Sequence, residues 1–196
     1  MTISKGAAWG VPAPLPAGGA IAATDAEVAV LTGSGEPIGL TGGDLCRTLG
    51  GRGSVERLTS SDAVTFPVDA LSVSLDGAPP QLAVAHVVAR SWGWRRVFLA
   101  MNAQWLGARN AAPRGHPDDG KMEMLRWSLS WREARQVLAR MRWGAHLPHP
   151  GIDGRSTAST SVTFDRARWV WVDGVRVGRA RALTVVVTPD ALRVVV

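Results

Sequence analysis

The chain has 196 residues, 46% of them hydrophobic, which is enough to bury the core of one large domain or of one domain plus a fragment. Its formal net charge of +6 rests on arginine, since Lys5 and Lys121 are its two lysines, and this balance favours anionic partners such as nucleotides, phospholipid head groups or nucleic acid. The single cysteine, Cys46, excludes an internal disulfide, and no apolar run in the sequence is long enough to span a bilayer.

The first 62 residues predict a small α/β unit followed by a polar connection. Residues 1–20 are rich in Pro, Gly and Ala and predict an extended arm that Trp9 anchors. Short strands are expected at residues 21–24 and 37–40. Between them we expect a helix over residues 26–32, with Asp25 as its N-cap.

A glycine-rich turn, Thr41-Gly42-Gly43-Asp44, follows the second short strand and opens another helix. Glycines let a ligand approach the backbone closely, and the N-terminus of a helix attracts phosphate. Gly42, Gly43 and Asp44 are therefore the candidate nucleotide- and phosphate-binding residues.

From residue 63 onward the pattern predicts a β-rich region, with strands at residues 68–75, 81–90 and 94–100. Asp76-Gly77 is a turn signal between the first two of these strands. His86 lies in an apolar stretch, so we interpret it as a core or sheet-face histidine rather than a ligand.

A loop with paired aspartates, HPDDG, precedes a strand in which Met122 and Met124 are expected to share a face. Two carboxylates in a tight turn suit a hard cation such as Mg²⁺ or Ca²⁺, which makes Asp118 and Asp119 the candidate metal ligands. The alternative is a turn in which the Asp side chains cap their own backbone.

The strongest helix signal is the capping box that begins at Ser130, and it predicts an amphipathic helix over residues 131–143. Arg132, Arg135 and Arg140 form a basic side that either meets an anionic membrane or is simply solvated. His146 and His149 follow without nearby cysteines or carboxylates, which is a poor metal signature.

Residues 162–196 alternate strands with turns, and the expected turns are Asp165-Arg166, Asp173-Gly174 and Pro189-Asp190. The whole pattern predicts a mostly β (α+β) protein. We expect an antiparallel β-sandwich or flattened barrel over residues 63–196, with one amphipathic helix. Residues 1–62 would form a small N-terminal α/β remnant.

The order of these motifs resembles the lower domain of bacterial diacylglycerol kinases and sphingosine kinases, over roughly the last two-thirds of the chain. In that family a strand ending in Asn leads to a DDG turn, as Asn102 leads to Asp118-Asp119-Gly120 here. A helix, a G-x-H segment, a DGE strand and a final strand pair follow. Upstream, Thr41-Gly42-Gly43-Asp44 looks like the GTGND turn of the family in a shortened form.

The resemblance implies ATP-dependent phosphoryl transfer to a lipid hydroxyl, with Mg²⁺ as the metal. Asp173 matches the Asp of DGE, which acts as the base in the family. Asp44, Asp69 and Asp119 match carboxylates of its metal and water network.

The chain also departs from the family pattern. Val175 stands where DGE has its Glu, and the GGDGT phosphate loop is missing, with Ala-Ala-Thr-Asp-Ala at residues 22–26 in the place of a degenerate remnant. We expect most of the nucleotide-binding domain of the family to be truncated in this chain. Because positioning of the triphosphate supplies most of the catalysis, we expect weak or absent lipid kinase activity from this chain alone.

Two functions therefore remain open: a diacylglycerol kinase-like enzyme whose ATP site comes from a partner chain or a second copy of this chain, and a noncatalytic lipid- or protein-binding module. A lipid or membrane surface is an expected partner, whereas no RNP, zinc or helix-turn-helix signature favours nucleic acid. Residues 1–5 lack the apolar segment of a signal peptide. We expect a cytoplasmic protein, with a peripheral place at the inner membrane face.

Overall fold

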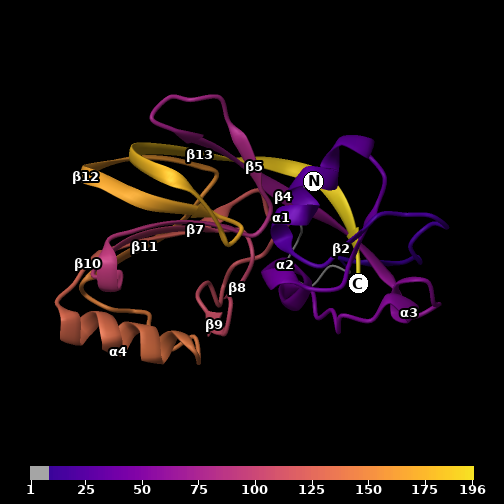
Figure 1. Ribbon diagram of the computed structural model, residues 1–196. Coiled ribbons are helices and arrows are strands. Elements are labelled where there is room, and N and C mark those ends of the chain that lie inside the picture. Colours follow the sequence, from indigo (N-terminus) through magenta and orange to yellow (C-terminus); the bar gives the residue numbers. More distant parts are fainter. Residues whose placement is uncertain (1–8) are drawn as a thin grey trace.

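The computed structural model describes residues 9–196, so the prediction about a signal peptide, which concerns residues 1–5, lies outside the described residues. In the described part, eleven strands form one sheet. Eight of them lie in the order β1-β4-β13-β12-β6-β7-β10-β11. The other three are β5, which pairs with β4, β3, which pairs with β13, and β2, which pairs with β3. The sheet bends over itself into two layers, and its two ends do not pair (Figure 1). The predicted mostly β sandwich is therefore confirmed, and the barrel alternative is not formed.

The bounds of the elements are as follows. The strands are β1 (Val11–Pro12), β2 (Ile21–Ala22), β3 (Ile38–Leu40), β4 (Val64–Leu75), β5 (Gln81–Ala83), β6 (His86–Arg90), β7 (Arg96–Met101), β8 (Trp105–Leu106), β9 (Arg109–Asn110), β10 (Met122–Ser128), β11 (Ile152–Thr157), β12 (Ser159–Val172) and β13 (Val175–Val195). The α-helices are α1 (Asp25–Leu31), α2 (Gly43–Thr48), α3 (Val55–Leu58) and α4 (Trp131–Met141), and the 3-10 helices are η1 (Thr32–Ser34) and η2 (Trp92–Trp94). None of the helices within residues 9–196 is both long and apolar enough to cross a membrane.

The main core fills the space between the two layers of the sheet, where Phe98, Val170 and Leu183 are buried together. Met122 and Met124 of β10 point into this core, as the alternation predicts. The opposite face of β10 is also apolar, because Leu125 and Trp127 pack under α4. Burial on both faces explains why the simple alternation ends after Met124.

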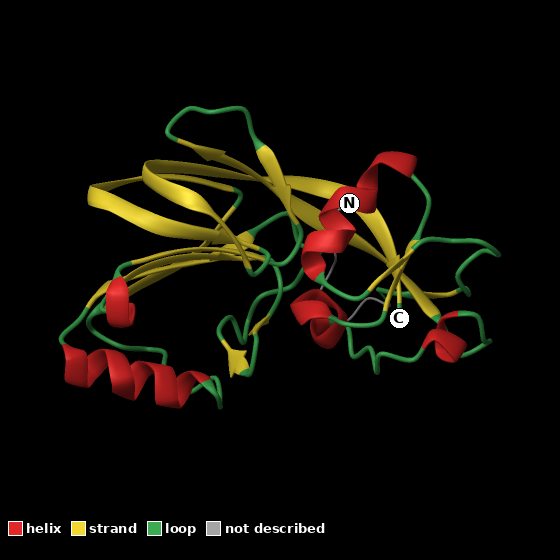
Figure 2. Ribbon diagram, viewed as in Figure 1, coloured by secondary structure: helices red, strands yellow, loops and turns green. Residues whose placement is uncertain are grey.

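Helix α4 covers the outer face of the lower layer (Figure 2). Both bonds of its capping box form between Ser130 and Glu133, and Ala134, Val137 and Met141 are its buried residues. The helix therefore begins where the sequence predicts and ends two residues earlier, at Met141.

The N-terminal part is a β-α-β unit, since β2 and β3 are parallel and α1 connects them. Strand β3 also pairs in parallel with the end of β13, so this unit extends the large sheet. Two local predictions are wrong here. Thr24 caps α1 in place of Asp25, and the polar connection contains α3, which Ser54 caps.

Three further predictions fail within the sheet. Residues 81–90 are two strands, because the chain breaks its pairing at Val84 and Ala85. Asp165-Arg166 and Pro189-Asp190 are not hairpin turns. They lie at register shifts inside the long strands β12 and β13. Asp173-Gly174 is confirmed as the turn between these strands, with φ of 47° and 81°.

Candidate functional site

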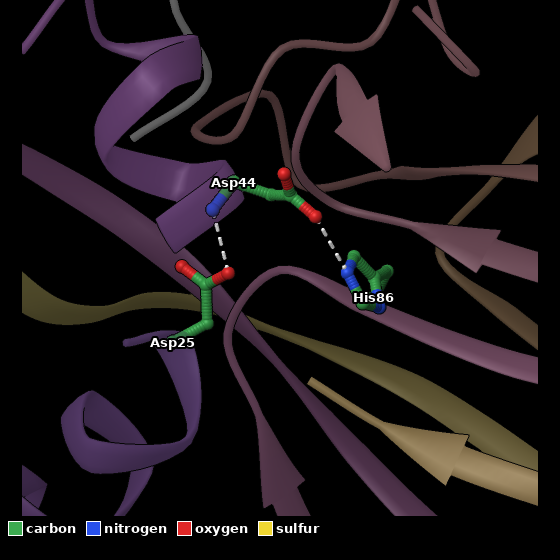
Figure 3. A group of neighbouring side chains, drawn as sticks. All are labelled: Asp25, Asp44 and His86. Atoms are coloured by element: carbon green, nitrogen blue, oxygen red, sulfur yellow. Dashed lines mark hydrogen bonds and ion pairs between the residues drawn. The ribbon is translucent and has the colours of Figure 1, made fainter. Parts of the chain in front are cut away.

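The N-termini of α1 and α2 meet the β5–β6 connection and the β12–β13 turn at one place in the fold. Asp25 and Asp44 come from the two helices, and His86 is the first residue of β6 (Figure 3). Asp173 lies in the β12–β13 turn and reaches the same connection. Asp25, His86 and Asp173 are buried, and Asp44 is partly so.

The carboxylate of Asp173 is bound by three backbone amides. Val84 N–H donates to Oδ2 at 2.8 Å, and the N–H groups of Ala85 and His86 donate to Oδ1 at 2.9 and 3.0 Å. The Asp173 N–H in turn donates to the His86 carbonyl at 3.0 Å. A carboxylate offers about four lone pairs, so little accepting capacity is left on this one. Asp173 therefore stabilises the break between β5 and β6.

The carboxylate of Asp25 occupies the N-terminus of α2. Its Oδ2 accepts from Asp44 N–H at 2.7 Å and its Oδ1 from Leu45 N–H at 3.0 Å. These are among the helix N–H groups that no helical carbonyl can reach. Burial raises the pKa of Asp25 from 3.8 to about 6, against the lowering effect of these two hydrogen bonds.

Gly42 and Gly43 bring the two helices into close contact. A Cβ at Gly42 would lie 2.3 Å from the Ala23 carbonyl oxygen, and one at Gly43 would lie 2.4 Å from Asp25 Oδ1. Gly43 also has φ of 93°, which side chains other than glycine rarely adopt. The close approach that the two glycines permit is thus to the start of α1.

Asp44 and His86 form a pair, with His86 Nε2 2.9 Å from Asp44 Oδ2. Burial by itself would raise the pKa of Asp44, but the bond from His86, the Gly107 N–H at 2.9 Å and the charge of Arg47 hold it below its ordinary value. Burial opposes the charged form of His86 as well, yet the bond to Asp44 and the charges of Asp173, Asp44 and Asp25 raise its pKa. Each partner of this pair therefore favours the charged form of the other, at the edge of the buried site.

A cleft of about 340 Å³ opens beside this pair. Asp44 and His86 contribute to its lining, and the other lining residues are Val88, Arg90, Trp94, Leu106, Gly107, Arg109, Trp171 and Gly174. The Arg90 guanidinium lies 5.0 Å from the Trp94 ring centre and 4.3 Å from that of Trp171. The Nε of Arg109 is buried without a hydrogen-bond partner. The cleft thus combines apolar walls with two cations.

The other predicted carboxylates form a second group around the DDG turn. Asp69 accepts from Gly120 N–H at 2.7 Å and from Asp190 N–H at 3.0 Å, which ties this turn to the bulge of β13. Asp119 accepts from Lys121 N–H at 2.9 Å. Asp118 accepts from Trp9 Nε1 at 3.0 Å, and burial raises its pKa to about 6.

Backbone N–H groups already occupy some of the oxygens that a hard cation would need. Within residues 9–196, Asp25, Asp44 and His86 are a set whose possible ligand atoms lie within 4.8 Å of one another, and Asp118 and Asp119 belong to no such set. Mg²⁺ and Ca²⁺ bind oxygen atoms that are free to coordinate. Both oxygens of Asp25 already accept helix N–H groups, and Asp119 is bonded to its own turn.

The structure thus brings the predicted Gly42, Gly43, Asp44 and Asp173 together and leaves Asp69, Asp118 and Asp119 in the second group. Sequence reasoning missed Asp25 and His86 as members of the site. Asp25 lies in the Ala-Ala-Thr-Asp-Ala segment that takes the place of a phosphate loop, and this position was its one signal. The cleft residues lie on β6, β8, β9 and β12, and no sequence motif links these strands to one another.

No protein-family profile matches this sequence, and no curated protein matches it. Solved structures do match. A diacylglycerol kinase from Bacillus anthracis str. Sterne superposes with a TM-score of 0.56 and 11% identity, over 81% of this chain and 66% of that one. Two structures from the same organism, which carry this assignment provisionally, give TM-scores of 0.61 and 0.60, each at 11% identity and over 81% of this chain and 69% of theirs. The chain has a diacylglycerol kinase-like fold.

Proposed function

We propose that this chain is a lipid-binding module built on the diacylglycerol kinase-like fold, and that alone it phosphorylates little or no lipid. The observation that carries this proposal is the Asp25 carboxylate on the N-terminal amides of α2. In the resemblance described above, these amides belong to the turn that would receive phosphate. A carboxylate in the same place competes with phosphate for the donors and repels its charge.

ATP does not fit the residues at this turn. Helix α2 has six residues, so its dipole is small. The N–H groups of Asp44 and Leu45 at its start already donate to the Asp25 carboxylate. The spaces beside Gly42 and Gly43 contain the Ala23 carbonyl and the Asp25 carboxylate.

The proposed base is also constrained. Asp173 is 7% exposed, and its two oxygens accept three backbone N–H groups. A base must come within hydrogen-bond reach of the hydroxyl whose proton it accepts. For Asp173 to do so, it would have to release amides that hold the β5–β6 connection.

Lipid binding is supported by the cleft beside Asp44 and His86. Trp94 and Trp171 give it apolar walls, and Arg90 and Arg109 bring positive charge. Because Arg109 lines the cleft and carries a positive charge, it can attract an anionic head group that enters there. The ligand class we propose is a lipid with an anionic head group.

The second candidate is a lipid kinase whose ATP site comes from another chain. The observation in its favour is that Asp44 and Asp173, which match two separate kinase motifs, both contact His86. Asp173 accepts the His86 backbone N–H, and Asp44 pairs with the His86 Nε2. The likeness to solved diacylglycerol kinases adds to it. Asp173 would be the base in that case, and Mg²⁺ and ATP would be required.

The test is ATP-dependent phosphorylation of diacylglycerol in mixed micelles, with binding of phosphatidic acid measured in parallel. We expect no turnover above background and saturable binding that Arg109→Gln weakens. Arg132→Gln, on an exposed face of α4, is the matched control and should leave binding unchanged. Turnover lost in Asp173→Asn would overturn the proposal in favour of the enzyme. Turnover only after a second protein is added would favour the split kinase.

A further inference from the structure

A second hollow, of about 500 Å³, lies outside the cleft and is lined by tryptophan and arginine. Its tryptophans are Trp92, Trp131 and Trp169, and its arginines are Arg90, Arg95, Arg96, Arg166, Arg168 and Arg179. We call it the Trp-Arg surface. Six arginines face one aspartate, Asp165, so this surface carries almost as much excess charge as the formal +6 of the whole chain.

The tryptophans of this surface are unusually exposed. Trp92 is 82% exposed, and Trp131 and Trp169 are each 43% exposed. Trp92 sits on η2 and contacts Trp131 at the start of α4 edge to face, with ring centres 4.9 Å apart. Two indoles from separate elements therefore form one projecting pair at the end of α4.

Several of these arginines are held by neighbours. Arg179 lies 5.6 Å from the centre of the Trp169 ring, and Arg95 lies 5.7 Å from that of Trp131. Arg96 and Arg168 are paired with Asp165 at 2.6 and 3.4 Å. Side chains that are already ordered lose less entropy when a partner binds. This arrangement differs from a solvated basic face, where long side chains move independently.

We propose that the Trp-Arg surface docks the protein on an anionic lipid bilayer. Indole rings partition to the boundary between head groups and acyl chains. Arginines near an anionic leaflet are attracted to it. A projecting tryptophan pair surrounded by arginines matches both features of that boundary.

A single-stranded nucleic acid would need a different arrangement. Bases stack on open aromatic faces. On Trp169 and Trp131 these faces are approached by arginines, and on Trp131 also by Trp92. A base that stacked on these rings would have to displace the arginines, whereas head groups could pair with them.

The position of the surface connects it to the cleft. Arg90 lines both hollows, because it lies at the end of β6 between Trp94 and Trp171. A lipid in the docked leaflet would therefore lie next to the mouth of the cleft. The docking proposal does not depend on whether this chain phosphorylates or binds a lipid in that cleft.

The experiment is co-sedimentation of the full chain with vesicles of phosphatidylcholine, with and without phosphatidylserine. We expect binding to the anionic vesicles alone, with release at high salt. The double variant Arg166→Gln/Arg179→Gln should weaken partitioning by roughly thirtyfold, at about fivefold for each charge. Trp92→Ala should weaken it several-fold.

Trp143→Ala is the matched control, because Trp143 is 81% exposed but lies beyond the other end of α4, roughly 18 Å along the helix from Trp131. Partitioning unchanged by this variant supports the proposal. The proposal is overturned if wild-type protein does not sediment, or if Arg132→Ala/Arg135→Ala/Arg140→Ala removes binding while Trp92→Ala does not. Retention on single-stranded RNA without vesicle binding would also overturn it. Near-ultraviolet circular dichroism of each variant verifies its fold.

Discussion

Replacement of Asp173 separates a structural clamp from a catalytic base. In Asp173→Ala, the amides of Val84, Ala85 and His86 lose their acceptor in a place that water reaches poorly. Each buried donor left without a partner costs about 1–3 kcal/mol, and neighbouring losses are less than additive. We expect the free energy of unfolding to fall by about 3–5 kcal/mol in total.

Asp76 supplies the matched control within the same chain. Asp76-Gly77 is also a left-handed turn, with φ of 50° and 79°, and the Asp76 carboxylate accepts from the N–H groups of Arg181 and Ala182. Asp76, however, is exposed, so water can replace its carboxylate. In both alanine variants a residue that tolerates positive φ is replaced by one that tolerates it less well. The difference between their free energies of unfolding therefore measures the buried hydrogen bonds of Asp173. We expect Asp76→Ala to cost about 1–2 kcal/mol.

The assay is urea denaturation followed by circular dichroism, with the free energies compared at equal slopes. Asp173→Asn should lie between wild type and Asp173→Ala, because its amide oxygen still accepts and Asn tolerates the turn. Equal midpoints for Asp173→Ala and Asp76→Ala would refute the clamp. A stable Asp173→Asn with lost lipid phosphorylation would make Asp173 a base.

The remaining predictions concern the helix contact, pH and cations. Gly43→Ala should lower the melting temperature far more than Gly50→Ala. Gly50 has φ of 79° with no atom within 4 Å of the added Cβ, whereas the added Cβ at Gly43 meets Asp25. Equal losses of melting temperature would contradict the packing explanation. The contribution of Asp25 to the free energy of unfolding should fall as pH rises from about 4 to about 6. The folded state raises its pKa from 3.8 to about 6, so the stability linked to its protonation is present below 3.8 and is lost as pH passes the folded value; the raised pKa of His86 extends the loss above pH 6.5. Asp25→Asn should flatten this slope in urea denaturation, and an unchanged slope would contradict the assignment. Millimolar Mg²⁺ or Ca²⁺ added after chelation should leave the melting temperature unchanged, because Asp119 already accepts Lys121 N–H; a rise that Asp119→Asn abolishes would restore the metal ligand.

Features with a local signal could be predicted from the sequence. The capping box at Ser130 and the turn at Asp173-Gly174 each depend on residues that are adjacent in the chain. The face shared by Met122 and Met124 follows from strand periodicity. These patterns predict the sandwich and its helix because the deciding interactions lie within a few residues.

Features set by distant contacts could not be predicted in this way. Pro189-Asp190 has the composition of a hairpin turn, yet β13 continues because its pairing with β4 resumes at Leu192. Asp25 is a residue type that often caps the helix that follows it. Here it accepts the first N–H groups of α2, about twenty residues further along the chain, and not those of α1. The cleft draws on strands whose neighbours are known only once the sheet is formed.

In our proposal the Asp25 carboxylate occupies the N-terminal amides of α2 and so prevents phosphate from binding there. Calorimetric titration of ATP with Mg²⁺ into the folded wild-type chain tests it most directly, since binding is measured apart from turnover. We expect no heat beyond dilution, for wild type and for the matched exposed variant Asp76→Asn alike. Saturable binding of one ATP per chain, weakened by Gly43→Ala but not by Asp76→Asn, would contradict it.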